Sequence, residues 1–241
     1  MRAKLIISYN GSLYSGSQFQ THTKNTISNT LITALRRLNI EQTPVASGRT
    51  DSGVHALRQV LHLDLPPFWS DLDRLKEMLN LQLPPSIRVN KIEKADDNFH
   101  ARFDAKSRLY RYVVKTTEPN AFEESFVTFI DNIDIDAISE AIRLFKGRHD
   151  FIYFHKSGND NTTTTREILS ASIYRYRDYY IFRFLGSGFL RSQIRMMVAA
   201  LLAISDKKLS SSQLKEQIDG IKQHTTAIAP ANGLYLSRIN Y

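Results

Sequence analysis

Apolar residues recur with strand-like and helix-like spacing along the first half of the chain. Residues 2–9 (RAKLIISY) predict a strand, and the apolar positions of Thr26–Leu38 have helical spacing. Leu57–Leu65 predicts a second strand, Ser70–Asn80 a helix capped by its first serine, and Ser86–Ala95 a third strand. The first half is therefore expected to alternate strands with helices.

The second half repeats this mixture of elements. Leu109–Lys115 predicts a strand and Asp134–Phe145 a helix. Two strands are expected at Ile168–Arg177 and Tyr179–Gly186, and the chain ends with a turn into a final strand. Between the strand at Tyr179–Gly186 and the final strand, Ser187–Ser205 predicts a buried helix with Arg191 and Arg195 one turn apart on it.

Two polar stretches of the second half are interpreted as irregular. Residues 157–167 (SGNDNTTTTRE) contain no apolar residue and predict an exposed loop. Residues 148–151 (RHDF) favour a capped turn over a metal-ligand site, since His and Asp are common turn residues.

The pattern as a whole predicts an α+β protein of two α/β halves, residues 1–103 and 104–241. The segments LIISYNGSLYSGSQ and YIFRFLGSGFLRSQ both run from a strand through a Gly/Ser turn and an aromatic to Ser-Gln, an echo that favours two related halves. A cleft between two such halves is a favoured place for a ligand.

Composition narrows the classes of function. Lys and Arg total 32 against 24 Asp and Glu, a formal charge of +8 that favours a polyanionic partner such as nucleic acid. The absence of cysteine excludes disulfides, thiolate metal sites and a cysteine nucleophile. The N-terminal apolar run is too short for a signal-peptide core, so a cytoplasmic location is expected.

Most motifs that would point to a known chemistry are missing. No P-loop, dinucleotide-binding or G-x-S-x-G motif occurs, and the seven histidines show no metal-binding spacing, so neither a cofactor nor a metal is expected. What remains is Asp51 in the stretch SGRTDSGVHA. Beside glycine it has two interpretations, a turn residue or a reactive carboxylate presented on a loop.

The residues around Asp51 resemble a known signature. GRTDSGVHALRQVLHLDL is similar to the motif of the tRNA pseudouridine synthase A family, in which the aspartate is the catalytic residue. Further blocks similar to the family follow in order over nearly the whole chain: NLQLPPSIRV, FHARFDAKSRLYRY, FKGRHDF, GFLRSQIRMMV and APANGLYL. The resemblance implies the pseudouridine synthase fold, with mixed, mainly antiparallel sheets flanked by helices and an active-site cleft between the halves.

The resemblance also implies a reaction and its residues. Uridine is isomerised to pseudouridine at positions 38, 39 and 40 of the tRNA anticodon arm by a homodimer without a cofactor, and Asp51 is the nucleophile. Arg195 is implied to keep Asp51 ionised and Tyr110 to stack on the uracil, while Leu234 lines the pocket. Arg49, two residues before Asp51, is suited to a phosphate contact. The route of attack, through C6, through C1′ or by a glycal, stays open.

Two positions depart from the family pattern, and the role of a third is open. Asn10 and Ser17 stand where relatives commonly have an acidic and an aromatic residue. An RNA-binding paralogue with weakened catalysis or shifted specificity is therefore the alternative. His55 is expected to order the loop rather than to move protons.

Overall fold

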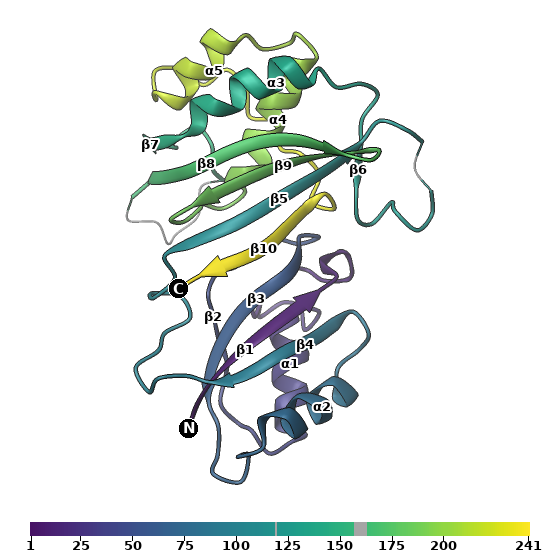
Figure 1. The fold of residues 1–241 in the computed structure, drawn as a ribbon, viewed down its shortest axis with the longest axis vertical. Helices are drawn as coiled ribbons and strands as arrows, with labels where there is room; N and C mark the ends of the chain where they lie inside the picture. The colour runs from purple at the N-terminus through teal and green to yellow at the C-terminus, as the bar shows by residue number, and fades with distance from the viewer. Residues whose placement is uncertain (119, 157–162) are drawn as a thin grey trace. The chain divides into compact units, whose positions relative to one another are not determined.

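A computed structural model describes residues 1–118, 120–156 and 163–241 (Figure 1). It divides into two compact units, the first formed by Met1–Lys106 with Tyr235–Tyr241 and the second by Ser107–Leu234. The chain thus leaves the first unit a few residues after the boundary expected from the sequence and returns to it with its final strand.

The first unit contains a mixed sheet. Strand β1 (Arg2–Tyr9) lies between β3 (His55–Asp64) and β4 (Ile87–Lys94) and is antiparallel to both. The short β2 (Val45–Ala46) pairs antiparallel with β3, and Tyr235–Leu236 of β10 (Leu234–Asn240) pair parallel with its first residues.

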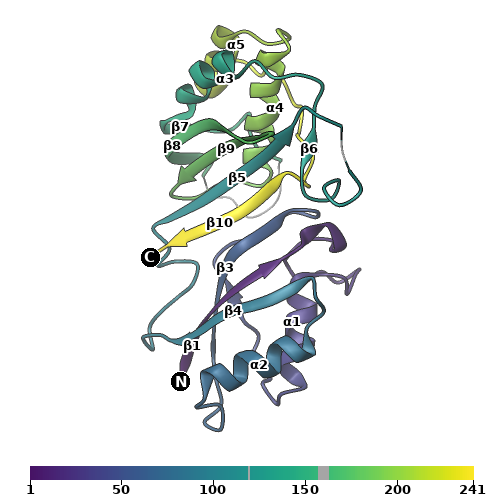
Figure 2. The same cartoon turned by 45° about the vertical axis from the view of Figure 1, so that its right-hand side comes forward.

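Two helices complete this unit. Helices α1 (Ile27–Arg36) and α2 (Leu72–Gln82) contact each other, and α2 packs against β4 (Figure 2). Their buried leucines belong to the same core as alternate residues of β1, since one face of each helix and one face of the strand are apolar. These core residues are Ala3, Leu5, Ile7, Leu31, Leu35, Leu75 and Leu79.

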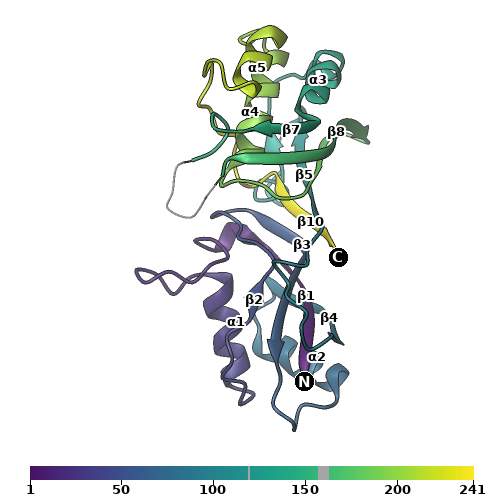
Figure 3. The same cartoon turned by 90° about the vertical axis from the view of Figure 1, so that its left-hand side faces the viewer.

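The second unit has its own sheet, in the order β5 (Ser107–Lys115), β9 (Tyr179–Gly186), β8 (Thr165–Tyr176) and β7 (Gly147–Asp150). These four strands pair antiparallel, and β6 (Thr128–Phe129) adds to β5 in parallel. Helix α3 (Ile135–Ala141), which continues as a 3-10 turn to Phe145, lies with α4 (Gln193–Ser205) and α5 (Ser211–Ile218) beside β7 and β8 (Figures 1 and 3). A cluster of buried aromatics fills this core: Tyr112, Phe145, Phe151, Phe154, Phe182 and Phe184.

The N-terminal caps of two helices can be compared with the predicted helix starts. Thr26, where the first helix was predicted to begin, caps α1 by accepting the Asn29 N–H at 3.2 Å. Helix α2 is capped by Asp71 and not by Ser70 as predicted, since the Asp71 carboxylate accepts the Arg74 N–H at 3.0 Å.

The helix predicted at Ser187–Ser205 is shorter than expected. It begins at Gln193 because Ser192 adopts a left-handed conformation with φ of 60°, and the Gln193 side chain accepts the Leu190 N–H at 2.7 Å. Arg191 therefore lies before the helix, and the prediction that it shares α4 with Arg195 was wrong. The helix itself is buried as predicted.

Three smaller differences concern the polar segments. Residues 147–150 form β7 against β8, so the turn predicted for RHDF was wrong. In the stretch predicted as a loop, residues 157–162 lie outside the described part, and β8 already begins at Thr165. Helix α5, which the sequence analysis missed, is stabilised by a capping box in which Ser210 and Gln213 bond each other's backbone N–H groups.

The predicted fold class is confirmed. Both units combine helices with mixed, mainly antiparallel strands, which is α+β architecture. Across the described residues, no helix has the length and apolar character of a membrane span.

Candidate active site

Asp51 lies in the loop between β2 and β3 of the first unit. Its carbonyl accepts the Val54 N–H at 3.2 Å, and Gly53 within this turn has φ of +80°, a conformation that glycine adopts without steric cost. Asp51 is half-buried and Arg49 is exposed. The turn and the presented carboxylate, the two interpretations of the sequence, are therefore compatible.

Thr50, the residue before Asp51, is held by hydrogen bonds to both its N–H and its carbonyl group. Thr50 donates its N–H to Oγ of Ser17 at 2.8 Å, and its carbonyl accepts the Ser17 N–H at 3.1 Å. The Thr50 hydroxyl also lies 2.8 Å from the hydroxyl of Tyr9, at the end of β1. Burial raises the pKa of Tyr9 to about 12.

Gln59 of β3 holds the start of the same loop. Its side chain accepts the Ser47 hydroxyl at 2.6 Å and donates to the Gly48 carbonyl at 2.9 Å. Gln59 is 2% exposed, and a buried amide with both ends bonded is a rigid attachment. Tyr9 and Gln59 were not predicted as residues of the site, because in the sequence both look like ordinary residues of half-buried strands.

His55 follows the loop as the first residue of β3. Its Nδ1 accepts the Gly11 N–H at 3.1 Å, and its ring stacks on Tyr235 with centroids 4.7 Å apart. At 1% exposure it is enclosed by the protein. These contacts favour the predicted ordering role.

Tyr110 and Tyr112 lie on β5 in the second unit and differ in environment. Tyr112 is fully buried, and its hydroxyl bonds Thr128 at 2.7 Å and the Pro230 carbonyl at 2.9 Å. Burial raises the pKa of Tyr112. Tyr110 is half-exposed, with its ring edge-on to Phe189 at 5.3 Å. Of the two, Tyr110 is thus the ring that a ligand can reach.

Arg195 and Leu234 are connected by one segment of the second unit, residues 229–233. Arg195 of α4 donates its Nε–H to the Ala229 carbonyl at 2.7 Å, and the Ala229 N–H donates back to the Arg195 carbonyl at 3.1 Å. The Gly233 carbonyl accepts the Val113 N–H of β5 at 2.8 Å, directly before Leu234, which is 6% exposed. The strand that carries Tyr110, helix α4 and Leu234 are therefore held in one framework.

The five residues predicted for the site fall into two groups. Asp51 and Arg49 share one loop of the first unit, whereas Tyr110, Arg195 and Leu234 belong to the framework of the second. Within residues 1–118, 120–156 and 163–241, no three His, Asp or Glu side chains are grouped as metal ligands would be.

The two departures from the family pattern both have structural partners. Asn10 accepts the Ser12 N–H at 3.1 Å and its hydroxyl at 2.7 Å, so it caps the short 3-10 turn Gly11–Leu13. Ser17 makes the bonds to Thr50 described above. The Asn10 amide thus stabilises a turn of the first unit, and the Ser17 hydroxyl bonds the loop of Asp51.

Comparison with known proteins extends these observations to the whole chain. The enzyme named tRNA pseudouridine synthase A from Campylobacter jejuni (strain RM1221) is 43% identical over 241 residues, the full length of both chains. Proteins of the same name are 37% identical in Helicobacter hepaticus, over 99% of this chain and 98% of theirs, and 38% identical in Wolinella succinogenes, over 98% and 92%.

Two further comparisons concern the fold and the family. A solved structure titled "Crystal Structure of a Cbf5-Nop10-Gar1 Complex" matches 83% of this chain and 44% of its own with a TM-score of 0.38 and 12% identity, a likeness on which nothing is built. The tRNA pseudouridine synthase family matches residues 5–104 and 141–241. With most of its length matched, and with relatives of that name at 37–43% identity, this chain belongs to the tRNA pseudouridine synthase family, whose members are isomerases.

Proposed function

We propose that this protein isomerises uridine to pseudouridine in tRNA, at positions 38, 39 and 40 of the anticodon arm. The observation that carries the proposal is the loop that presents Asp51, within a chain matched over its full length by proteins named tRNA pseudouridine synthase A. The net charge of +8 supports a polyanionic substrate.

The reaction replaces one glycosidic bond with another and involves no net oxidation or reduction. The bond between N1 and C1′ breaks, the uracil turns, and C5 bonds to C1′. The C5 proton leaves and N1 ends with a proton. An ionised Asp51 is a competent oxygen nucleophile for a covalent intermediate, by attack on C6 or C1′, and in a glycal route it acts as the base. None of these routes requires a cofactor.

The other residues of the site support this chemistry in distinct ways. The Arg195 guanidinium favours the ionised form of Asp51. In this proposal, the Tyr110 ring stacks on the flipped uracil, and its hydroxyl takes the C5 proton late in the reaction. Arg49 contacts a phosphate beside the flipped nucleotide, and Leu234 forms an apolar wall against the uracil.

The proposed assembly is a cytoplasmic homodimer. In it, the halves expected at residues 1–103 and 104–241 together complete the active-site cleft, and tRNA binds across both subunits. Recognition rests on shape and backbone contacts more than on base reading, as is common for structured RNA.

The test is incubation of purified protein with tRNA transcripts that lack modification, followed by mapping of pseudouridine at single-nucleotide resolution. Product at positions 38, 39 or 40 supports the proposal. Folded protein that binds tRNA and forms no pseudouridine supports the alternative, an RNA-binding paralogue. A mass measurement in solution tests the homodimer.

A further inference from the structure

Ser17 is a buried polar residue that contacts the loop of Asp51 from a distant part of the chain. It is 7% exposed, and Thr50 is 8% exposed. The Ser17 N–H and hydroxyl engage both backbone groups of Thr50, at 3.1 Å and 2.8 Å. Two bonds between the same two residues fix both distance and orientation.

We infer that Ser17 is a positioning residue that holds the peptide preceding Asp51 and thereby sets where its carboxylate lies. This inference rests on the proposed function, in which Asp51 attacks the uridine. The Thr50 carbonyl and the Asp51 N–H belong to one planar peptide unit, so a hold on the Thr50 carbonyl limits rotation of the backbone that carries Asp51.

Ser17 is itself fixed by the first turn of α1. Its carbonyl accepts both the N–H of Ser28 at 3.0 Å and the Ser28 hydroxyl at 2.6 Å. The preceding residue, Gly16, has φ of +116°, and a Cβ there would lie 3.3 Å from the Thr50 carbonyl oxygen. A glycine is thus required for Ser17 to approach Thr50, and the helix anchors the contact.

A second hydroxyl supports the same residue from the sheet. Tyr9 bonds the Thr50 side chain at 2.8 Å, while Ser17 bonds the Thr50 backbone. Removal of the Ser17 hydroxyl leaves the buried Thr50 N–H without its acceptor, and a buried unsatisfied donor is costly enough to shift the backbone toward another partner. A displacement of about 1 Å at a reacting group can cost a hundredfold in rate.

The experiment compares Ser17→Ala with three other variants. Ser17→Thr retains the hydroxyl, and Tyr9→Phe removes the bond to the Thr50 side chain together with the weaker contacts of the Tyr9 hydroxyl with Gln59 and Ser17. Asp71→Ala is the matched control, because it removes the cap of α2 in the same unit without touching Ser17 or Thr50. Each variant is assayed for the single-turnover rate of pseudouridine formation, tRNA affinity, melting temperature and exchange of the Thr50 amide hydrogen.

The expected result is a rate roughly ten- to a hundredfold lower in Ser17→Ala, with tRNA affinity within about twofold of wild type and faster exchange at Thr50. Ser17→Thr restores the rate, and Tyr9→Phe gives a smaller loss. Asp71→Ala lowers the melting temperature but leaves the rate close to wild type at a temperature where it is folded.

Three results would overturn the inference: a wild-type rate in Ser17→Ala, an equal rate loss in Asp71→Ala at matched melting temperature, or unchanged exchange at Thr50 in Ser17→Ala. The amide readout separates this inference from the proposed function. A wild-type chain that forms no pseudouridine defeats the function, whereas slow Thr50 exchange that is lost in Ser17→Ala still supports the hold on the loop. If Ser17→Ala fails to fold, exchange of the Thr50 amide hydrogen in wild type and Ser17→Thr decides: slow exchange in both supports the hold, and fast exchange in both overturns it.

Discussion

Arg195 and Ala229 bond each other in both directions, with the Arg195 Nε–H on the Ala229 carbonyl at 2.7 Å and the Ala229 N–H on the Arg195 carbonyl at 3.1 Å. The guanidinium is therefore held by the protein's own backbone rather than left to rotate. A positive charge with a fixed direction is better suited to hold a carboxylate ionised than one on a mobile side chain.

We expect Arg195→Lys to lose most of the activity although it keeps the charge. A guanidinium can bond Ala229 through its Nε–H while its terminal nitrogens face the substrate, whereas an ammonium has one nitrogen and cannot do both. The single-turnover rate should fall by at least roughly tenfold, the scale of one charged hydrogen bond. Arg191→Lys, an exposed arginine just before α4, is the matched control. Equal rates in the two variants would contradict the role of Arg195.

Tyr110 and Tyr112 should separate activity from stability. Tyr110→Phe is expected to slow pseudouridine formation with a smaller change in stability than Tyr112→Phe, since the half-exposed Tyr110 hydroxyl is proposed to move a proton. Tyr112→Phe should instead lower the free energy of unfolding by about 1–3 kcal/mol, because the buried Thr128 hydroxyl and the Pro230 carbonyl lose a partner. Thermal melts and rates on both variants make the comparison, and a reversed pattern would refute it.

The sequence predicted most elements because their apolar spacing is regular. Strand β1 and helix α1 agree with expectation to within a residue or two, since Leu5, Ile7, Leu31 and Leu35 mark their buried faces. The start of α4 was not predictable from spacing. Phe189 and Leu190 continue the apolar pattern, and only the left-handed backbone of Ser192 and the bond from Leu190 to the Gln193 side chain end it.

The site was predicted through Asp51, whose neighbours form a recognisable motif, and not through the residues that support its loop. Ser17 contacts a residue 33 positions away, and Gln59 bonds Ser47 12 positions away. Such contacts depend on the register of β1 and β3 and on the turn at Gly16, which composition and periodicity do not encode.

Gly11 provides a steric test of the same region. A Cβ on Gly11 would lie 1.9 Å from the Val54 carbonyl oxygen, whereas a Cβ on Gly48, in the Asp51 loop, meets nothing within 4 Å. Gly11→Ala should therefore lower the free energy of unfolding by about 1–3 kcal/mol, as overpacking does, and Gly48→Ala should change it much less. Urea unfolding followed by fluorescence of Trp69, the single tryptophan, measures both. Equal stabilities would show that the backbone yields at no cost.

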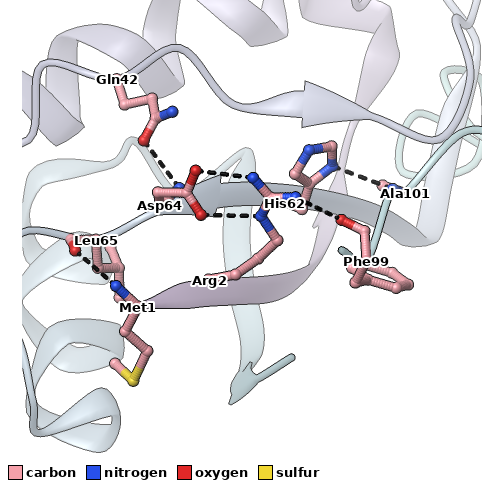
Figure 4. Close-up of polar contacts among 8 residues, drawn as sticks. All are labelled: Met1, Arg2, Gln42, His62, Asp64, Leu65, Phe99 and Ala101. Carbon is pink, nitrogen blue, oxygen red and sulfur yellow. Dashed lines mark hydrogen bonds and ion pairs between the residues drawn. The ribbon is translucent and has the colours of Figure 1, made fainter. Parts of the chain in front are cut away.

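We expect His62 to make the stability of the first unit depend on pH. Its Nδ1 accepts the Ala101 N–H at 3.1 Å, so that nitrogen carries no proton, and it lies close to the Arg2–Asp64 ion pair (Figure 4). Burial lowers the pKa of His62, and the nearby His100 and Arg2 lower it further. The bonds from Arg2 hold the pKa of Asp64 below its usual range, so Asp64 titrates at lower pH than His62.

The sign of the His62 effect follows from its lowered pKa. The pKa of His62 in the unfolded chain is about 6.5. Just below this pH, the unfolded chain binds a proton at His62, whereas the folded chain binds it only at lower pH. The free energy of unfolding should therefore fall as pH decreases from 7 toward 5. His62→Asn keeps an acceptor near the position of Nδ1 and should flatten this slope, while His22→Asn, an exposed control, should not. An unchanged slope in His62→Asn would assign the pH dependence to other groups.

Site-mapped pseudouridine formation by wild type, Asp51→Asn and Asp97→Asn, an exposed control, decides whether Asp51 performs the reaction. We expect product at positions 38 to 40 with wild type and Asp97→Asn, and none with Asp51→Asn although that variant is folded and binds tRNA. Product formed by Asp51→Asn at the wild-type rate would contradict this expectation.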